Sequence, residues 1–311
     1  MELSVLAGSS NPSLAESIAE RLGIPLASRA LTRFPDTELR VELKTTVRAR
    51  DVYLVQPTGP PVDEHLMDLL LMADACRRAG AERITAVIPY LGYARQDRRV
   101  SGRESVGARL VADLIAASGA SRVVAVDLHT AALEAVFSIP IEHLSAVPSL
   151  AEALRPHLSS KAVVVAPDLG AVKLARRYAR ILGLPMAIVH KTRISAEQVE
   201  AGEVVGDVRG RSPVIVDDMI STGGTIEAAH QALLAAGCAG DVVVASTHGL
   251  FTGPAVERLT ALGITALFTT DSLATRATPL ALHSVGLAPM LAEAIKRLHE
   301  GRSLSDLLAR E

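Results

Sequence analysis

Short apolar runs recur along the chain, largely without the polar alternation of a half-exposed strand. They occupy residues 52–55, 84–88, 123–126, 162–166, 186–189, 214–216, 242–245 and 264–268. Unalternating runs rich in valine, isoleucine and alanine are typical of strands that are buried on both faces. We therefore predict that these runs are the strands of mainly parallel sheets.

Between the runs, apolar residues repeat every three or four positions, which predicts amphipathic helices. The residues expected on the buried helix faces are Leu66, Leu69, Leu70, Ala73, Leu110, Val111, Leu114, Ile115, Ala175, Tyr178, Ile181, Leu182, Ile226, Ala229, Leu233 and Leu234. Gly119, Gly183 and Gly237 follow three of these stretches and are expected to end the helices. The alternation of strands and helices predicts an α/β fold with parallel sheets flanked by helices.

The same rhythm of strands and helices begins a second time near residue 145. Because 311 residues exceed the usual size of a single core, we expect two similarly built domains. They cover residues 1–145 and 146–311, and the last helix is available to pack on the N-terminal domain.

Composition narrows the class of function. The formal net charge is -2, tryptophan is absent and aromatic residues make up 3% of the chain, which argues against a nucleic-acid-binding surface. The N-terminus lacks the pattern of a signal peptide, and no apolar run reaches membrane-spanning length. Two cysteines are too few for a disulfide framework, and both are expected to be small buried hydrophobic residues. We expect a cytoplasmic protein that acts on small molecules.

The most informative stretch follows the buried run 214–216. Asp217 and Asp218 come first, and the following turn contains Ser221, Thr222, Gly223, Gly224 and Thr225. Adjacent glycines let backbone N–H groups converge on one point, and the helix N-terminus adds positive potential there. The carboxylates can accept hydrogen bonds from sugar hydroxyls. This stretch predicts a pocket for a phosphorylated sugar and differs from a Walker A loop, which requires Gly-Lys-Ser/Thr.

Three other polar segments follow predicted strands, where ligands bind in open α/β sheets. In the loop 89–99, Arg95 can bind phosphate oxygens and Gln96 can reach a purine edge, although a solvated basic loop is the alternative. His129 is a candidate metal ligand or acid/base, with a structural role as its alternative. Asp168 is either a helix cap or a metal ligand. His129 and Asp168 suit Mg²⁺ only if the two domains face each other.

Two further segments are ambiguous when taken alone. Lys191 and Arg193 stand at the root of a polar segment and can close over a phosphate group, or can be ordinary charges of an exposed hairpin. The acidic turn with Phe34, Asp36 and Glu38 is a simple loop unless another observation supports a role for it.

In their order along the chain, these segments resemble the ribose-phosphate diphosphokinase family, also called phosphoribosyl pyrophosphate synthetases. The resemblance extends over essentially the whole chain. The Asp-Asp and glycine turn is shared with all type I phosphoribosyltransferases. The Arg-Gln-Asp loop and the Phe-Pro-Asp-x-Glu turn are much more specific to the synthetases.

The resemblance implies two type I phosphoribosyltransferase-like domains in each chain. It also implies a homo-oligomer, in which the chains form dimers that stack as hexamers. It further implies a binding site for ATP, the donor of the diphosphoryl group, with Mg²⁺ as cofactor. The residues implied for ATP are Phe34, Asp36, Thr37, Glu38, Arg95 and Gln96, with the turn at 34–38 supplied by a neighbouring subunit. His129 and Asp168 are the implied magnesium ligands, and Lys191 and Arg193 the cationic pair of a flexible catalytic loop.

On the acceptor side, the resemblance places Asp217 and Asp218 against the ribose hydroxyls. It assigns the 5-phosphate of ribose 5-phosphate to Arg193 and to the turn from Ser221 to Thr225. Many bacterial members have Asp where this chain has Ser221, and a Lys-Arg-Arg-Pro loop where this chain has Lys-Thr-Arg-Ile.

The expected reaction converts ATP and ribose 5-phosphate into AMP and 5-phospho-α-D-ribose 1-diphosphate. A phosphoribosyltransferase that consumes the diphosphate with a nucleobase is one alternative. A non-catalytic regulatory subunit is another, and an α/β oligomer whose glycine turn binds nothing is the third.

Overall fold

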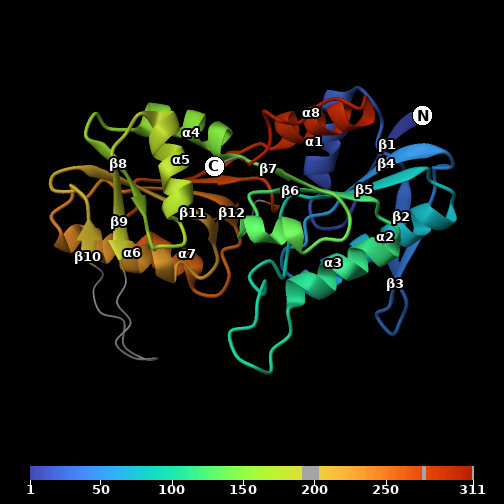
Figure 1. The fold of residues 1–311 in the computed structure, drawn as a ribbon, viewed down its shortest axis with the longest axis horizontal. Helices are drawn as coiled ribbons and strands as arrows, with labels where there is room; N and C mark the ends of the chain where they lie inside the picture. Colours follow the sequence, from blue (N-terminus) through green and yellow to red (C-terminus); the bar gives the residue numbers. More distant parts are fainter. Residues whose placement is uncertain (191–202, 275–277, 310–311) are drawn as a thin grey trace. The chain divides into compact units, whose positions relative to one another are not determined.

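The computed structural model describes residues 1–190, 203–274 and 278–309 and divides into two compact units (Figure 1). Unit 1 contains Met1–Ser145, Ser272–Ala274 and the segment from Gly286 onward. Unit 2 contains Ala146–Asp271 and the residues that lead up to Val285. The structure therefore groups the last helix with unit 1, whereas the division at residue 145 kept 146–311 together.

Within the described residues, unit 1 is built on a five-stranded sheet in the order β1-β4-β5-β6-β7, and each neighbouring pair is parallel. Its strands are β1 (Glu2–Ala7), β4 (Arg50–Val55), β5 (Arg83–Ile88), β6 (Arg122–Val126) and β7 (Ile141–Leu144). A separate antiparallel hairpin consists of β2 (Arg29–Arg33) and β3 (Leu39–Leu43). The predicted runs 52–55, 84–88 and 123–126 all lie in strands of the parallel sheet, which confirms the prediction.

Helices cover both faces of this sheet (Figure 1). Helix α1 (Pro12–Leu22) packs with α8 (Ala288–His299) on one face, and α2 (Val62–Arg78) packs with α3 (Gly107–Ser118) on the other. The short 3₁₀ helix η1 (Ala131–Ala135) precedes β7. One prediction is wrong for α3: Leu110 and Leu114 are 59% and 40% exposed, because only the Val111 and Ile115 face turns toward the core.

A buried ionic cluster ties α8 to the sheet of unit 1. The Asp51 carboxylate is 1% exposed and accepts hydrogen bonds from Arg83 at 3.1 and 2.5 Å. His299 of α8 places Nδ1 2.8 Å from the same carboxylate, and the Tyr53 hydroxyl lies 3.3 Å away. Burial, followed by the negative charge of Asp51, raises the pKa of Tyr53. A buried charge is tolerated when it is paired in this way.

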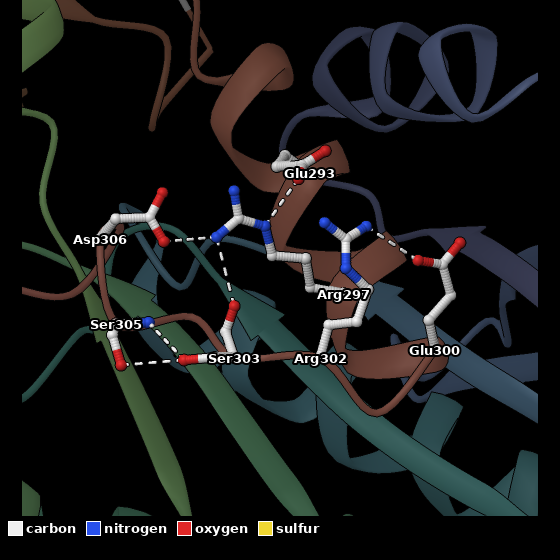
Figure 2. A network of polar contacts seen from close by, with 7 residues as sticks. All are labelled: Glu293, Arg297, Glu300, Arg302, Ser303, Ser305 and Asp306. Carbon is white, nitrogen blue, oxygen red and sulfur yellow. Dashed lines mark hydrogen bonds and ion pairs between the residues drawn. The ribbon is translucent and has the colours of Figure 1, made fainter.

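The tail after α8 is held by a second polar network (Figure 2). Arg297 pairs with Glu293 one turn earlier at 2.6 Å, and the same guanidinium bonds Asp306 in the tail and the Ser303 carbonyl at 3.2 Å. The Ser305 N–H donates to Ser303 Oγ at 3.2 Å. These contacts fold the tail back against the last turn of α8 and hold it within unit 1.

Unit 2 has, within the described residues, a seven-stranded sheet in the order β10-β9-β8-β11-β12-β13-β14. Its strands are β8 (Ala162–Ala166), β9 (Met186–His190), β10 (Glu203–Val205), β11 (Ser212–Ile220), β12 (Val243–Gly249), β13 (Ala266–Thr270) and β14 (Leu282–Val285). Among the described strands of this sheet, only the edge pair β10–β9 is antiparallel. The runs 162–166, 186–189 and 214–216 lie within these strands, whereas the runs 242–245 and 264–268 begin one and two residues before β12 and β13.

Helices again cover both faces of the sheet (Figure 1). The elements are α4 (Val147–Leu154) with η2 (Arg155–His157), α5 (Val172–Leu182), α6 (Gly224–Ala235) and α7 (Ala255–Ala261). Helices α4 and α5 lie on one face, and α6 and α7 on the other. The chain therefore leaves the adjacent strands β8 and β11 toward opposite faces, which is the arrangement at which open α/β sheets bind ligands in a crevice at the carboxyl ends of their strands.

Two details of the predicted core of unit 2 are wrong. Leu234 of α6 is 46% exposed, because the buried face runs through Ile226, Ala229 and Leu233 instead. Cys238 is only half-buried, because it follows the Gly237 stop at the rim of the core, whereas Cys76 is fully buried as predicted. The predicted stops at Gly119, Gly183 and Gly237 are confirmed, since each adopts a positive φ at a helix end.

Candidate functional site

Asp168, Asp217 and Asp218 meet at the carboxyl ends of β8 and β11. Asp168 follows β8, and the other two lie near the end of β11, which continues to Ile220 and beyond the predicted run 214–216. Burial raises the pKa of Asp217 well above its ordinary value. The charge and side-chain hydrogen bond of Asp218 add to the shift, and the charge of Asp168 adds a smaller part. This edge therefore concentrates negative charge and favours hydroxyl donors or a cation.

The Asp168 carboxylate is already engaged through one oxygen. Its Oδ1 accepts hydrogen bonds from the N–H groups of Gly170 at 2.9 Å and Ala171 at 3.1 Å, just before α5. The helix-cap role that the sequence left open is therefore present. The magnesium role of Asp168 stays a prediction.

Magnesium binding needs few protein ligands, because Mg²⁺ keeps several waters and takes one or two carboxylates. Burial first, and the neighbouring carboxylates next, raise the pKa of Asp217, and a cation at this edge would offset both effects. His129 belongs to unit 1 and Asp168 to unit 2. Within the described ranges, no group of three or more His, Cys, Asp or Glu side chains could hold a metal ion by itself.

The turn after β11 leads directly into α6, as the sequence predicts. Gly223 caps α6 with φ 77° and ψ -3°, a left-handed conformation that strains any residue with a Cβ. None of the described residues accepts a hydrogen bond from the N–H groups of Gly224 or Thr225. Free N–H groups and the positive end of the helix dipole are the features that favour an anion at such a turn. Phosphate binding by the turn stays a prediction.

The segment after β12 braces this turn from outside. The Thr252 N–H donates to the Ser221 carbonyl at 2.9 Å, and the two hydroxyls lie 3.1 Å apart. Arg258 of α7 donates from Nη1 to the Thr222 carbonyl at 2.6 Å. The sequence analysis missed Thr252 and Arg258, because both contacts span more than thirty positions of the chain and no local pattern marks them.

In unit 1, a hydrogen bond joins the arginine loop to the segment that contains His129. The Thr130 hydroxyl donates to Asp97 at 3.1 Å, so the structure brings Arg95, Gln96 and His129 to one edge of the sheet. All three side chains are exposed. They are accessible to a ligand, and their roles stay predictions.

His143 supports the segment that contains His129 through a hydrogen bond to its backbone. The Leu128 N–H donates to His143 Nε2 at 2.9 Å, so the ring proton stands on Nδ1 and points to Glu134 at 2.9 Å. The Ser145 hydroxyl donates to Asp127, which adopts the positive φ of 38°. These contacts fix the backbone that presents His129.

The predicted adenine turn is the tip of the β2–β3 hairpin. Thr37 has φ 77°, and the Phe34 N–H donates to the Glu38 carbonyl at 2.9 Å. Phe34 is 48% exposed, and Asp36 is exposed beside it. An open pocket of about 480 Å³ lies between the hairpin and α2, and its lining consists of Arg33, Thr37, Glu38, Leu39, Asp63, Glu64, Met67 and Leu71.

Lys191 and Arg193 lie outside the described residues, so their predicted catalytic roles stay predictions. Among the described helices, none is both long enough and apolar enough to cross a membrane.

Comparison with known proteins extends over both units. Residues 3–119 match the family model for the N-terminal domain of ribose phosphate pyrophosphokinase, and residues 144–255 match the phosphoribosyl transferase domain.

Curated relatives align along almost their full length. The ribose-phosphate pyrophosphokinase of Parasynechococcus marenigrum is 45% identical over 98% of this chain and 93% of its own. That of Caldanaerobacter subterraneus is 44% identical over 98% of this chain and 97% of its own. The crystal structure of phosphoribosylpyrophosphate synthetase from Mycobacterium smegmatis matches with a TM-score of 0.91 and 38% identity, over 97% of this chain and all of that one.

Proposed function

The chain belongs to the ribose-phosphate pyrophosphokinase family, and from this premise we propose that it transfers the β,γ-diphosphoryl group of ATP to ribose 5-phosphate. The products are AMP and 5-phospho-α-D-ribose 1-diphosphate. The match of residues 3–119 to the N-terminal domain of ribose phosphate pyrophosphokinase carries the proposal. The Asp217–Thr225 segment alone would equally suit a phosphoribosyltransferase.

Ribose 5-phosphate binds in the crevice of unit 2. Asp217 and Asp218 accept hydrogen bonds from the ribose hydroxyls, which offset the burial and the neighbouring negative charge that raise the pKa of Asp217. The turn from Ser221 to Thr225 donates its free N–H groups to the 5-phosphate. Ser221 keeps a hydroxyl next to Thr252 and adds no negative charge beside the phosphate.

ATP binds at the edge of unit 1 where Arg95, Gln96 and His129 meet. The Asp97–Thr130 hydrogen bond holds the two loops in one arrangement. The exposed turn with Phe34, Asp36, Thr37 and Glu38 receives the adenine of a neighbouring subunit's ATP, so the active enzyme is a homo-oligomer, either a dimer or a hexamer. Both substrates are cytoplasmic metabolites, and we place the enzyme in the cytoplasm.

The transfer needs no covalent enzyme intermediate. The C1 hydroxyl oxygen of the ribose attacks the β-phosphorus in line, while the bond from that phosphorus to the oxygen of the α-phosphate breaks and AMP leaves. The protein positions both substrates and stabilises charge. Lys191 and Arg193 meet the charge that develops on the transferred group. When Mg²⁺ is bound by His129 and Asp168, it supplies charge neutralisation on the phosphate oxygens.

An assay of AMP formation tests this function. The purified chain is incubated with MgATP and ribose 5-phosphate, and separately with the diphosphate and a nucleobase. Release of AMP only when ribose 5-phosphate is present supports the proposal. Nucleotide formation in the second incubation supports a phosphoribosyltransferase, and a folded protein without activity in either supports a regulatory subunit.

A further inference from the structure

Arg258 of α7 contacts the chain on both sides of Gly223, the N-cap of α6. Its Nη1 donates to the Thr222 carbonyl at 2.6 Å, and its Nε pairs with Glu227 Oε2 at 2.7 Å. Thr222 precedes Gly223, and Glu227 lies in the first turn of α6. The Arg258 side chain is 28% exposed, so solvent screens this contact only in part.

The contact with Thr222 fixes the orientation of one peptide plane in the turn. In a trans peptide the C=O and the following N–H point in opposite directions. When Arg258 holds the Thr222 carbonyl, the Gly223 N–H must therefore point away from Arg258. Two adjacent glycines otherwise leave this turn with large conformational freedom.

Two independent contacts thus order the turn before a ligand arrives. Thr252 holds the Ser221 carbonyl, and Arg258 holds the Thr222 carbonyl and the first turn of α6 through Glu227. A preformed loop binds its ligand more tightly, because less conformational entropy is lost on binding.

We propose that Arg258 is a positioning residue for ribose 5-phosphate, acting through Thr222 and Glu227 without touching the substrate. This inference rests on the proposed function, since it assigns the 5-phosphate to the Ser221–Thr225 turn. The Glu227 carboxylate balances the Arg258 charge, so the effect on affinity comes from the geometry of the turn and not from attraction of the phosphate.

The test compares Arg258→Met with Arg211→Met. Arg211 also forms an ion pair, with Asp207 at 3.1 Å, but it precedes β11 and stands at the opposite end of that strand. We expect Arg258→Met to raise the KM and the calorimetric Kd for ribose 5-phosphate about tenfold, the effect of losing one charge-assisted hydrogen bond. The kcat and the KM for ATP should stay within about twofold, as expected when only ground-state binding is lost. Arg211→Met should change none of them.

Two further variants separate positioning from other roles. Arg258→Lys can still donate to Thr222 and should recover part of the affinity. If Arg258→Met does not fold, Arg258→Gln takes its place, because its shorter side chain cannot make both contacts: a raised Kd supports the proposal, and an unchanged Kd contradicts it. Glu227→Gln leaves the Arg258 charge unbalanced, so tighter binding in this variant would show simple attraction and overturn the positioning role.

Calorimetry without ATP keeps this inference separate from the proposed function. A wild-type protein that binds ribose 5-phosphate but forms no AMP overturns the function and leaves the Arg258 comparison valid. Equal Kd values for folded Arg258→Met and wild type overturn the role of Arg258 and leave the function standing. A wild-type protein that neither forms AMP nor binds ribose 5-phosphate overturns both.

Discussion

The Thr130 hydroxyl donates a hydrogen bond to the Asp97 carboxylate across 3.1 Å, although the two residues are 33 positions apart. Asp97 belongs to the arginine loop after β5, and Thr130 follows His129 after β6. This hydrogen bond holds the two loops together, so they form one surface, although the sequence presents them as separate motifs. This surface is where we place the nucleotide.

Removal of this hydroxyl should therefore weaken the use of ATP. We expect Thr130→Val to raise the KM for ATP about fivefold, because a hydrogen bond of this kind contributes ~1 kcal/mol. The KM for ribose 5-phosphate should not change, since Thr130 belongs to unit 1. Steady-state kinetics with each substrate varied in turn measures both values.

Thr260→Val is the matched control for Thr130→Val. The Thr260 hydroxyl also makes a hydrogen bond, to the Val256 carbonyl at 2.7 Å, but it lies on the exposed side of α7. The control should leave both KM values unchanged. An unaltered KM for ATP in Thr130→Val would show that the loops are not coupled for nucleotide binding.

Gly223→Ala should damage the phosphate turn through backbone strain alone. An added Cβ would meet its neighbours at ordinary distances of 3.5 Å or more, but φ is 77°. We expect a loss of about 1–2 kcal/mol in the free energy of unfolding and a raised KM for ribose 5-phosphate. Chemical denaturation and kinetics measure the two effects.

Gly183→Ala separates strain from function. Gly183 has φ 70°, ends α5 in the same unit and has open space around its Cα. This variant should lose a similar amount of stability without any change in KM. The same KM for ribose 5-phosphate in both variants would show that the turn at Gly223 does not take part in binding this substrate.

Asp217→Asn should stabilise the ligand-free protein at neutral pH. The pKa of Asp217 is raised in the folded state, mainly by burial and next by Asp218, so the folded protein binds this proton more tightly than the unfolded chain. Stability therefore falls as the pH rises from the unfolded pKa through the folded pKa. Asparagine cannot ionise and avoids this cost.

We expect Asp217→Asn to raise the Tm by several degrees at neutral pH and to lose this advantage as the pH falls toward about 4, where the unfolded carboxyl is protonated. Ribose 5-phosphate binding should be lost in the same variant. Glu257→Gln, at an exposed position of α7, is the control and should leave the Tm unchanged. A lower Tm for Asp217→Asn at neutral pH would contradict the raised pKa.

Much of the fold follows from local pattern. The runs 162–166 and 214–216 are uninterrupted and apolar because β8 and β11 are buried on both faces. Strands of this kind can be predicted from the sequence pattern alone. The short edge strands β10 and β14 are partly exposed and carry no such pattern. Helix faces were harder to predict: Leu110 and Leu114 repeat at helical spacing yet face solvent, because tertiary contacts decide which side is covered.

The candidate site likewise has parts that local sequence pattern predicts and parts that it does not. The turn at Gly223 and the helix after it could be predicted, because the glycines and the apolar repeat of the helix follow each other directly in the chain. The braces from Thr252 and Arg258 could not, since they depend on how the next strand–helix unit packs beside it. The Asp168 cap was predictable as one of two alternatives, because the residues it caps follow at once in the chain.

Product analysis by ³¹P nuclear magnetic resonance tests the central claim most directly. The wild-type chain is incubated with MgATP and ribose 5-phosphate, and the products are identified by their phosphorus couplings. The account predicts equal amounts of AMP and of a sugar that carries a diphosphate at C1 and a phosphate at C5. Formation of ADP with ribose 1,5-bisphosphate, or no consumption of ribose 5-phosphate, would contradict it.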